Sequence, residues 1–332
     1  MAPETEQEIL HKLRELEEKV DGLTESHRLL KQAYARSRAH LRRPWLRPPM
    51  WTYEQYAPRK LSINPRGPAP KLPASPIGIA IVTPSFNQGP FIRDTIESVL
   101  CQEYPTLHYH VQDGASIDDT VEILRSFGDR ISWKSIRDEG QADAINLGFA
   151  GLDGDIMAYL NSDDTLLPGT LTYVADYFSR NPDVDIVYGH RIFIDSSGDE
   201  IGRAVFPQHG SNALKYAGYV PQETMFWRRK VWNAVGPMDV SFNYALDWDF
   251  MLRAQAAGFK FRRLSRFLAC FRVHDAQKTT KLYELGRQEM QRLRLRSLGY
   301  LPTSAAIGWA LSPYLARQFM AHWCYRIGLL RL

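Results

Sequence analysis

Residues 4–42 carry one apolar seam on an otherwise polar segment. Its members recur in alternating steps of four and three: Ile9, Leu13, Leu16, Val20, Leu23, His27, Leu30 and Tyr34. This spacing is typical of a coiled-coil heptad. It predicts a coiled-coil helix over residues 1–43 through which the chain forms a homo-oligomer. The alternative is a single amphipathic helix that packs on its own domain.

Residues 44–76 are rich in proline, which disfavours helices and central strands. Trp45, Trp51, Tyr53 and Tyr56 accompany the prolines. The composition predicts an extended linker, or a strap of which the aromatic part docks on the next domain.

From Ile77 onward, apolar strands alternate with amphipathic helices. The expected strands are IGIAIVTPS, HYHVQDG, ISWKSIRD, DIMAYLNSDD and DIVYGHRIFID, and the expected helices are FIRDTIESVLCQ, DDTVEILRSF, QADAINLGFAG and about 169–180. This order predicts an α/β domain over 77–279, with a doubly wound, mostly parallel sheet and helices on both faces. A strand near 224–227, a helix over about 249–257 and strands around 259–274 complete it.

Residues 280–332 are expected to form basic amphipathic helices: one over 280–298 and one or two short ones over 303–332. The formal net charge of +4 is segregated, because residues 251–332 carry +12 and residues 67–250 carry −12. Arginines mixed with tryptophan and tyrosine suit an anionic membrane surface. The alternative is a helical cap packed on the domain. No recognition motif indicates nucleic acid as a partner.

The chain has three widely spaced cysteines, which do not form a disulfide framework and fit a reducing compartment. Its first residues lack the apolar core of a signal peptide, and the uncharged stretch before Arg317 contains Pro302 and Pro313, which makes it a poor membrane span. We therefore expect a cytoplasmic protein, with a peripheral position at the inner face of the cell membrane as the more specific alternative.

Acidic residues follow several of the expected strands. The strongest signal is Asn161-Ser162-Asp163-Asp164, because two adjacent carboxylates repel each other unless a cation or hydrogen-bond donors compensate. Mg²⁺ and Mn²⁺ prefer oxygen ligands and leave positions open for phosphate. The alternative is a turn that caps the next helix.

Three further signals are weaker when taken singly. Asp113, which precedes a glycine, can receive a nucleobase N–H or simply order a capped turn. Asp247 is a candidate general base or an acid at a helix N-terminus. His274 follows an apolar strand and is either a metal ligand or a structural side chain.

Seven segments, taken together and in order, resemble the large inverting glycosyltransferase family called family two, with the metal-dependent GT-A fold. They are VTPSFNQGPFIRDTIESVL, VQDGASIDDTVEIL, DEGQADAINLGF, GDIMAYLNSDDTLLPG, PQETMFWRRKVW, VGPMDVSFNYALDWDFMLR and FRVH. The similarity runs from Ile77 to His274. It leaves the expected coiled coil and the basic C-terminal region outside.

The resemblance implies a role for each matching residue. A nucleotide-sugar would be held by Pro84, Ser85, Asn87, Asp113, Asp138, Gln141, Asp143, Asn146, Asn161 and Asp163. Mn²⁺ or Mg²⁺ would be bound by Asp163, Asp164 and His274. Asp247 would be the catalytic base, and the acceptor or sugar side would include Gln222, Glu223, Trp248 and Asp249.

The sequence departs from the family pattern at two positions. Asn161 replaces the first acid of the usual Asp-x-Asp motif, and Leu246 replaces the Glu that often precedes the catalytic Asp. The resemblance implies sugar transfer to a hydroxyl acceptor, such as a growing or lipid-linked polysaccharide. The alternative function is a non-catalytic, nucleotide-sugar-binding scaffold in a glycan assembly complex.

Two other enzyme classes are excluded by the loop after the first strand. A sugar nucleotidyltransferase needs a basic, glycine-rich loop there, but TPSFNQGPF has no basic residue before Arg93. A dinucleotide-binding oxidoreductase needs G-x-G-x-x-G, which is absent.

Overall fold

The computed structural model describes residues 52–63, 72, 75–275, 283–330 and 332, which belong to one compact unit from Pro48 to Leu332. The predicted coiled coil of residues 1–43 lies outside the described residues, as does much of the proline-rich segment.

One half of the central sheet is parallel. Its strands follow the order β3-β2-β1-β4, with bounds β1 (Ile79–Ser85), β2 (Leu107–Asp113), β3 (Ser132–Ser135) and β4 (Ile156–Tyr159). The register pairs Ser85 with Asp113 and Asp113 with Ser135. The carboxyl ends of these strands therefore meet at one edge, where ligands bind in open α/β sheets.

The other half of the sheet is mixed. Its strands are β5 (Thr165–Leu166), β6 (Ile186–Ile194), β7 (Glu200–Ala204), β8 (Phe226–Arg228) and β9 (Phe261–Arg272). The short β8 runs antiparallel to both β4 and β6, whereas β6 and β9 are parallel. Because β4 and β6 are both antiparallel to β8, they point the same way, and β9 is parallel to β6. The sheet is therefore mixed: six of its nine described strands share one direction, as predicted for a mostly parallel sheet, and β5, β7 and β8 run against them.

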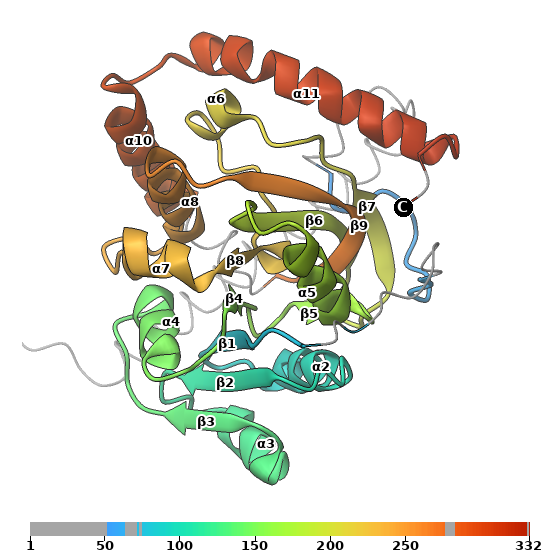
Figure 1. The fold of residues 1–332 in the computed structure, drawn as a ribbon, viewed down its shortest axis with the longest axis vertical. Coiled ribbons are helices and arrows are strands. Elements are labelled where there is room, and N and C mark those ends of the chain that lie inside the picture. Colours follow the sequence, from blue (N-terminus) through green and yellow to red (C-terminus); the bar gives the residue numbers. More distant parts are fainter. Residues whose placement is uncertain (1–51, 64–71, 73–74, 276–282, 331) are drawn as a thin grey trace, which may run out of the picture. The chain divides into compact units, whose positions relative to one another are not determined.

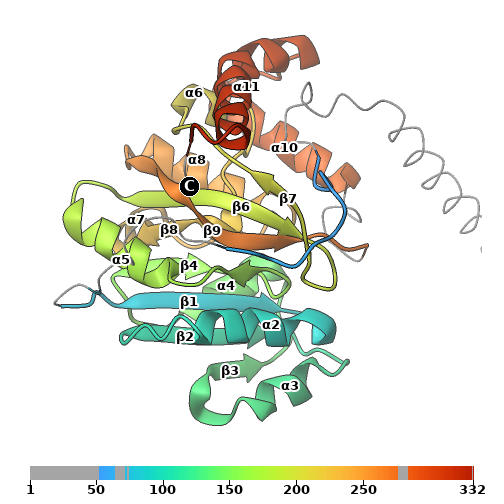
Figure 2. The same ribbon diagram turned by 90° about the vertical axis from the view of Figure 1, so that its right-hand side faces the viewer.

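Helices cover both faces of the sheet (Figures 1 and 2). Their bounds are α2 (Gly89–Leu100), α3 (Thr120–Ser126), α4 (Gln141–Phe149), α5 (Thr170–Arg180), α6 (Ser211–Leu214), α7 (Arg229–Val235), α8 (Leu246–Ala256), α10 (Tyr283–Leu298) and α11 (Ser304–Arg326). Alternate residues of β1 serve two cores: Ile79 and Ile81 pack with α2, α3 and α5, and Ala80 and Val82 pack with α4 and α8. Burial on both faces explains the continuous apolar run of this strand.

Residues 52–63 lie as a strap along β7. The backbone N–H of Gln55 donates to the carbonyl of Ile201 at 2.8 Å, and that of Arg59 donates to the carbonyl of Glu200 at 3.1 Å. This part of the proline-rich segment thus adds hydrogen bonds to a sheet edge that would otherwise lack partners.

The last segment forms one 23-residue helix, α11, although Pro313 lies inside it. Proline lacks the N–H that would bond the carbonyl four residues earlier. That carbonyl belongs to Trp309, and it accepts a hydrogen bond from the Ser312 hydroxyl at 2.8 Å instead. Within the described part of the chain, no helix is long and apolar enough to cross a membrane.

Candidate active site

Asp113, at the end of β2, is fully buried and holds the loop that follows it. One carboxylate oxygen accepts from the backbone N–H of Ser116 at 2.9 Å and from the Ser135 hydroxyl at 2.6 Å. The other accepts from the Ser116 hydroxyl at 2.5 Å. Asn87 adds a bond from the N–H of Ile117 to its side-chain oxygen at 2.9 Å, so the loops after β1 and β2 are tied together.

Two polar groups at this strand edge have no partner among the described residues. They are the hydroxyl of Ser85 and the side-chain NH₂ of Gln112, and both residues are buried. Pro84, which directly precedes Ser85 in β1, is buried as well. An unsatisfied buried donor is costly unless a ligand completes it, so this edge is suited to a polar ligand.

Asp138 approaches the same edge from the loop after β3. Its carboxylate accepts from the N–H of Gly140 at 2.9 Å. Its pKa is raised by burial and by the charges of Asp143 and Asp113. A Cβ at Gly114 would lie 2.8 Å from a carboxylate oxygen of Asp138, so only glycine allows this approach.

A chain of side-chain amides connects α4, the loop after β4 and the 3₁₀ turn Gln222–Thr224. Gln141 donates to the oxygen of Asn161 at 2.7 Å, and Asn161 donates to the oxygen of Gln222 at 3.1 Å. Gln222 in turn donates to the carbonyl of Tyr159 at 2.7 Å. Asn161 thus bridges two elements as both donor and acceptor, which an aspartate at this position cannot do.

The two acidic residues of the motif differ in orientation. Asp163 is partly exposed, and its carboxylate lies 3.0 Å from Nε2 of His274. Asp164 is buried and accepts the backbone N–H of Arg272 at 3.0 Å. Burial raises the Asp164 pKa well above its usual value, with further contributions from the charges of Asp163 and Glu223.

A carboxylate and an imidazole side by side form a donor pair that suits Mn²⁺, and Mg²⁺ to a lesser degree. Asp163 and His274 form such a pair, whereas Asp164 points into the protein. Among the described residues, no group of three or more His, Cys, Asp or Glu side chains is arranged to hold a metal ion. Any cation at this pair would therefore need ligands beyond these two side chains.

Asp247 lies in the first turn of α8 and is only partly exposed. Burial raises its pKa to about 6, although hydrogen bonds from the backbone N–H groups at Trp248 and Asp247 and the charge of Arg191 lower it. The Tyr159 hydroxyl has a raised pKa owing to burial and to the charges of Asp247, Glu223 and Asp164. Asp247 and the acidic motif therefore share one electrostatic environment.

Arg191 of β6 is a central residue that the sequence reading missed. It forms a two-pronged ion pair with the buried Glu223, at 2.7 and 2.9 Å, and stacks on the Phe271 ring. Its charge lowers the pKa values of Asp164, Glu223 and Asp247. The sequence feature that could have identified Arg191 is its place inside an apolar strand, since a guanidinium in the interior requires a partner.

Arg272 is a second missed residue, two positions before His274. Its side chain is almost fully buried, and Nε donates to the carbonyl of Asp163 at 2.9 Å. Its other end pairs with Asp94 of α2 at 2.9 Å. Arg272 thus fixes the acidic loop to β9 and to α2.

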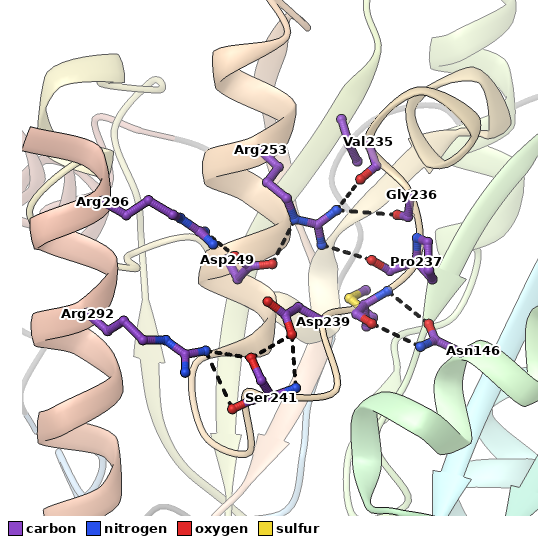
Figure 3. A network of polar contacts seen from close by, with 11 residues as sticks. Asn146, Val235, Gly236, Pro237, Asp239, Ser241, Asp249, Arg253, Arg292 and Arg296 are labelled. Atoms are coloured by element: carbon purple, nitrogen blue, oxygen red, sulfur yellow. Dashed lines mark hydrogen bonds and ion pairs between the residues drawn. The ribbon is translucent and has the colours of Figure 1, made fainter.

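Trp248 and Asp249 turn away from the acidic cluster. The Trp248 ring N–H donates to the carbonyl of Leu214 at 2.7 Å. Asp249 is completely buried between Arg253 of its own helix and Arg296 of α10 (Figure 3). Both side chains are held in the interior, so the structure does not bring them to the expected acceptor side.

Asn146 and Asp143 are also occupied by local bonds. The amide of Asn146 both donates to and accepts from the backbone of Met238, at 2.9 Å each (Figure 3). Asp143 accepts the N–H of Glu139 at 3.0 Å. In this structure, Asn146 connects α4 to the loop before α8 rather than facing the strand edge.

Glu289 of α10 holds the start of α8. Its buried carboxylate accepts three backbone N–H groups, those of Asn243, Tyr244 and Ala245, at 2.8 Å each. These residues directly precede the helix that carries Asp247. A carboxylate at a helix N-terminus also complements the helix dipole, so α10 positions the candidate base.

The arrangement is that of a glycosyltransferase with a GT-A-like fold: a mixed α/β fold with acidic and amide side chains after its parallel strands. Residues 80–240 match the model of the family described as glycosyl transferase family 2. This match takes in a little under half of the chain, so the chain is similar to that family over its α/β domain.

Three known proteins illustrate the similarity. The PGL/p-HBAD biosynthesis glycosyltransferase of Mycobacterium bovis (strain BCG / Pasteur 1173P2) is 26% identical over 179 residues, which are 52% of this chain and 68% of that protein. S. aureus TarS 1–349 in complex with UDP-GlcNAc superposes with a TM-score of 0.56 at 18% identity, over 74% of this chain and 73% of the other. Mannosyltransferase PcManGT from Pyrobaculum calidifontis, in complex with GDP-Man and Mn²⁺, superposes with a TM-score of 0.53 at 16% identity. The superposition covers 91% of this chain and 80% of the other.

Proposed function

We propose that this chain transfers a sugar from a nucleotide-sugar to a hydroxyl acceptor with inversion at the anomeric carbon. The observation that carries the proposal is the shared environment of Asp247, with its pKa of about 6, and of the acidic loop that pairs Asp163 with His274. A carboxylate of that pKa is largely ionised at neutral pH yet basic enough to accept a proton.

The strand edge is the proposed donor site. The unpartnered Ser85 hydroxyl and Gln112 amide offer hydrogen bonds to the base or ribose, beside Asp113 and Asp138. The bound UDP-GlcNAc of TarS and GDP-Man of PcManGT support a nucleotide-sugar as the donor class. The hydrogen-bonded amides of Gln141, Asn161 and Gln222 would then line the side of the site next to the donor sugar.

Asp163 and His274 are the proposed protein ligands of Mn²⁺ or Mg²⁺. A bound cation would supply positive charge next to the donor diphosphate. The inward-facing Asp164 supports the loop, because its carboxylate accepts from Arg272 and Asn161.

The chemical step is a single displacement. Asp247 accepts the proton of the acceptor hydroxyl, whose oxygen forms a bond to the anomeric carbon from the face opposite the leaving group. The bond from that carbon to the diphosphate oxygen breaks, and the nucleoside diphosphate leaves with the bonding electrons. The acceptor is proposed to be a growing or lipid-linked glycan, in line with the biosynthetic role in the name of the M. bovis relative.

Nucleotide release from a panel of UDP-, dTDP- and GDP-sugars with Mn²⁺ tests this function. We expect one donor class to be turned over by the wild type and not by Asp247→Asn, while both bind that donor. Donor binding with neither transfer nor hydrolysis in any combination would instead favour the non-catalytic scaffold.

A further inference from the structure

The helix α11 carries large apolar side chains on its outer face as well as on its inner face. Its inner face carries Leu311, Tyr314, Gln318 and His322, which are all buried. Its outer face carries Trp309, Met320 and Trp323, which are 81%, 57% and 45% exposed. A surface helix normally buries its apolar stripe and turns polar groups to the solvent.

The exposed apolar residues form one continuous stripe. Trp309, Pro313, Ala316, Met320, Trp323 and Ile327 follow one another in steps of three and four, and all are exposed. Residues at these spacings lie on the same side of a helix. We call this set the outer stripe; both views of the fold place α11 along an outer side of the folded unit (Figures 1 and 2).

The inner face combines apolar and polar contacts and is firmly attached, with Leu311 and Tyr314 in the main core. Both polar atoms of the Gln318 amide and the hydroxyl of Tyr314 are buried without a partner among the described residues. Tyr314 stacks on Tyr219 with ring centroids 4.1 Å apart, and the Tyr325 hydroxyl accepts from Arg203 at 2.9 Å. The helix is therefore anchored with its outer stripe facing outward.

The charged residues of α11 itself are all basic. No aspartate or glutamate occurs after Glu289, while six arginines follow it. Arg317 and Arg326 are exposed on α11 itself. Tryptophans next to arginines are typical of helices that lie in the interface of an anionic bilayer, with the apolar face among the acyl chains and the guanidinium groups at the phosphates.

We propose that the outer stripe of α11 docks the enzyme on an anionic lipid surface, with α11 parallel to that surface. Burying Trp309, Met320 and Trp323 in the interface removes from water the apolar area that the fold leaves exposed. The inference is independent of the proposed reaction, since lipid binding is measured without donor or acceptor.

Vesicle flotation of the full chain tests the proposal. We expect recovery with vesicles of phosphatidylcholine mixed with phosphatidylglycerol, and much less with phosphatidylcholine alone. Replacing both Trp309 and Trp323 by serine should weaken partitioning roughly a hundredfold. Replacing Arg317 and Arg326 by glutamine should weaken it roughly thirtyfold on anionic vesicles only.

Leu295→Ser is the matched control, because Leu295 is 47% exposed on α10, outside the stripe. It should bind vesicles like the wild type, and thermal unfolding should show that all variants are folded. Absence of wild-type binding to anionic vesicles overturns the proposal, and so does equal binding by the double tryptophan variant. A concentration-dependent dimer that the tryptophan replacements abolish, without lipid binding, would assign the stripe to a second copy of the chain.

Discussion

Asp247 combines two properties that rarely occur together in an aspartate: partial solvent contact and a pKa raised to about 6 by burial. Replacing it by asparagine keeps the shape and removes the proton acceptor. We expect transfer to fall about 10²–10⁴-fold, the usual contribution of a positioned general base. Donor binding, measured by calorimetry, should change little, and full transfer by Asp247→Asn would assign the base elsewhere.

The pH dependence of transfer follows from the same residue. The base must be ionised to accept a proton, so the rate should rise as the pH increases through about 6 and level off above it. This is measured as kcat against pH at saturating donor. An acidic limb centred near the ordinary aspartate value of about 4 would contradict the desolvated environment.

Asp163 is the motif acid that faces His274. If the pair holds a cation, Asp163→Asn should raise the apparent Kd of Mn²⁺, measured by calorimetry with UDP or GDP, by about tenfold or more. Asp176→Asn is a suitable control, because Asp176 pairs only with Arg180 in the described structure of α5. Unchanged Mn²⁺ affinity in Asp163→Asn would remove Asp163 from the metal site.

At the scale of single residues, the sequence predicted which residues follow the strands, because a short polar stretch after an apolar run can be recognised in the sequence itself. It did not predict Arg191 or Arg272, whose partners lie more than 30 residues away in the chain. Nor did it predict that the Asn146 amide bonds the Met238 backbone, since these two residues are also far apart in the chain.

Among the elements, hydrophobic periodicity predicted the helices and strands up to β6 except the two-residue β5, because each of the others buries a regular face or run. It did not identify which strands run antiparallel to the rest, and it left open whether residues 303–332 form one helix or two. The direction of β8 depends on its pairing between β4 and β6. The continuity of α11 depends on the Ser312 hydroxyl, which donates to the Trp309 carbonyl in place of the missing N–H of Pro313.

Helix α10 lies beyond the family match, which ends at residue 240, yet it holds the helix of the candidate base. Glu289→Ala leaves three backbone N–H groups without their acceptor, so the free energy of unfolding should drop by about 3 kcal/mol. We also expect a lower kcat with an unchanged KM for the donor, because α8 shifts and the strand edge does not.

Glu284→Ala provides the comparison on the same helix. Glu284 is exposed and pairs with Arg287, so its loss should change neither stability nor kcat appreciably. If Glu289→Ala lowered stability while kcat stayed at the wild-type value, α10 would stabilise the fold without positioning Asp247.

On the scale of the whole molecule, the strap, β7 and α11 meet at Glu200. Its fully buried carboxylate pairs with Arg203 at 2.7 Å and with Arg59 of the strap at 2.6 Å, and it accepts from the Tyr56 hydroxyl. Arg203 in turn donates to Tyr325, near the end of α11. The N-terminal strap and the C-terminal helix are therefore fastened to the sheet through one acid.

Burial alone would raise the pKa of Glu200, but the hydrogen bonds from Arg203, Tyr56 and Arg59 lower it overall. A lowered pKa in the folded state stabilises the fold above the unfolded value of about 4.3, and this contribution is lost as the pH falls through the folded pKa. Glu200→Gln should therefore reduce the free energy of unfolding by about 2–3 kcal/mol at neutral pH. The gap to the wild type should shrink below about pH 4, as measured by urea unfolding at each pH. Asp199→Asn, which removes only the exposed pair with Lys60, is the control and should show neither effect. If the difference in unfolding free energy between Glu200→Gln and the wild type did not depend on pH, Glu200 would act through its shape rather than its charge.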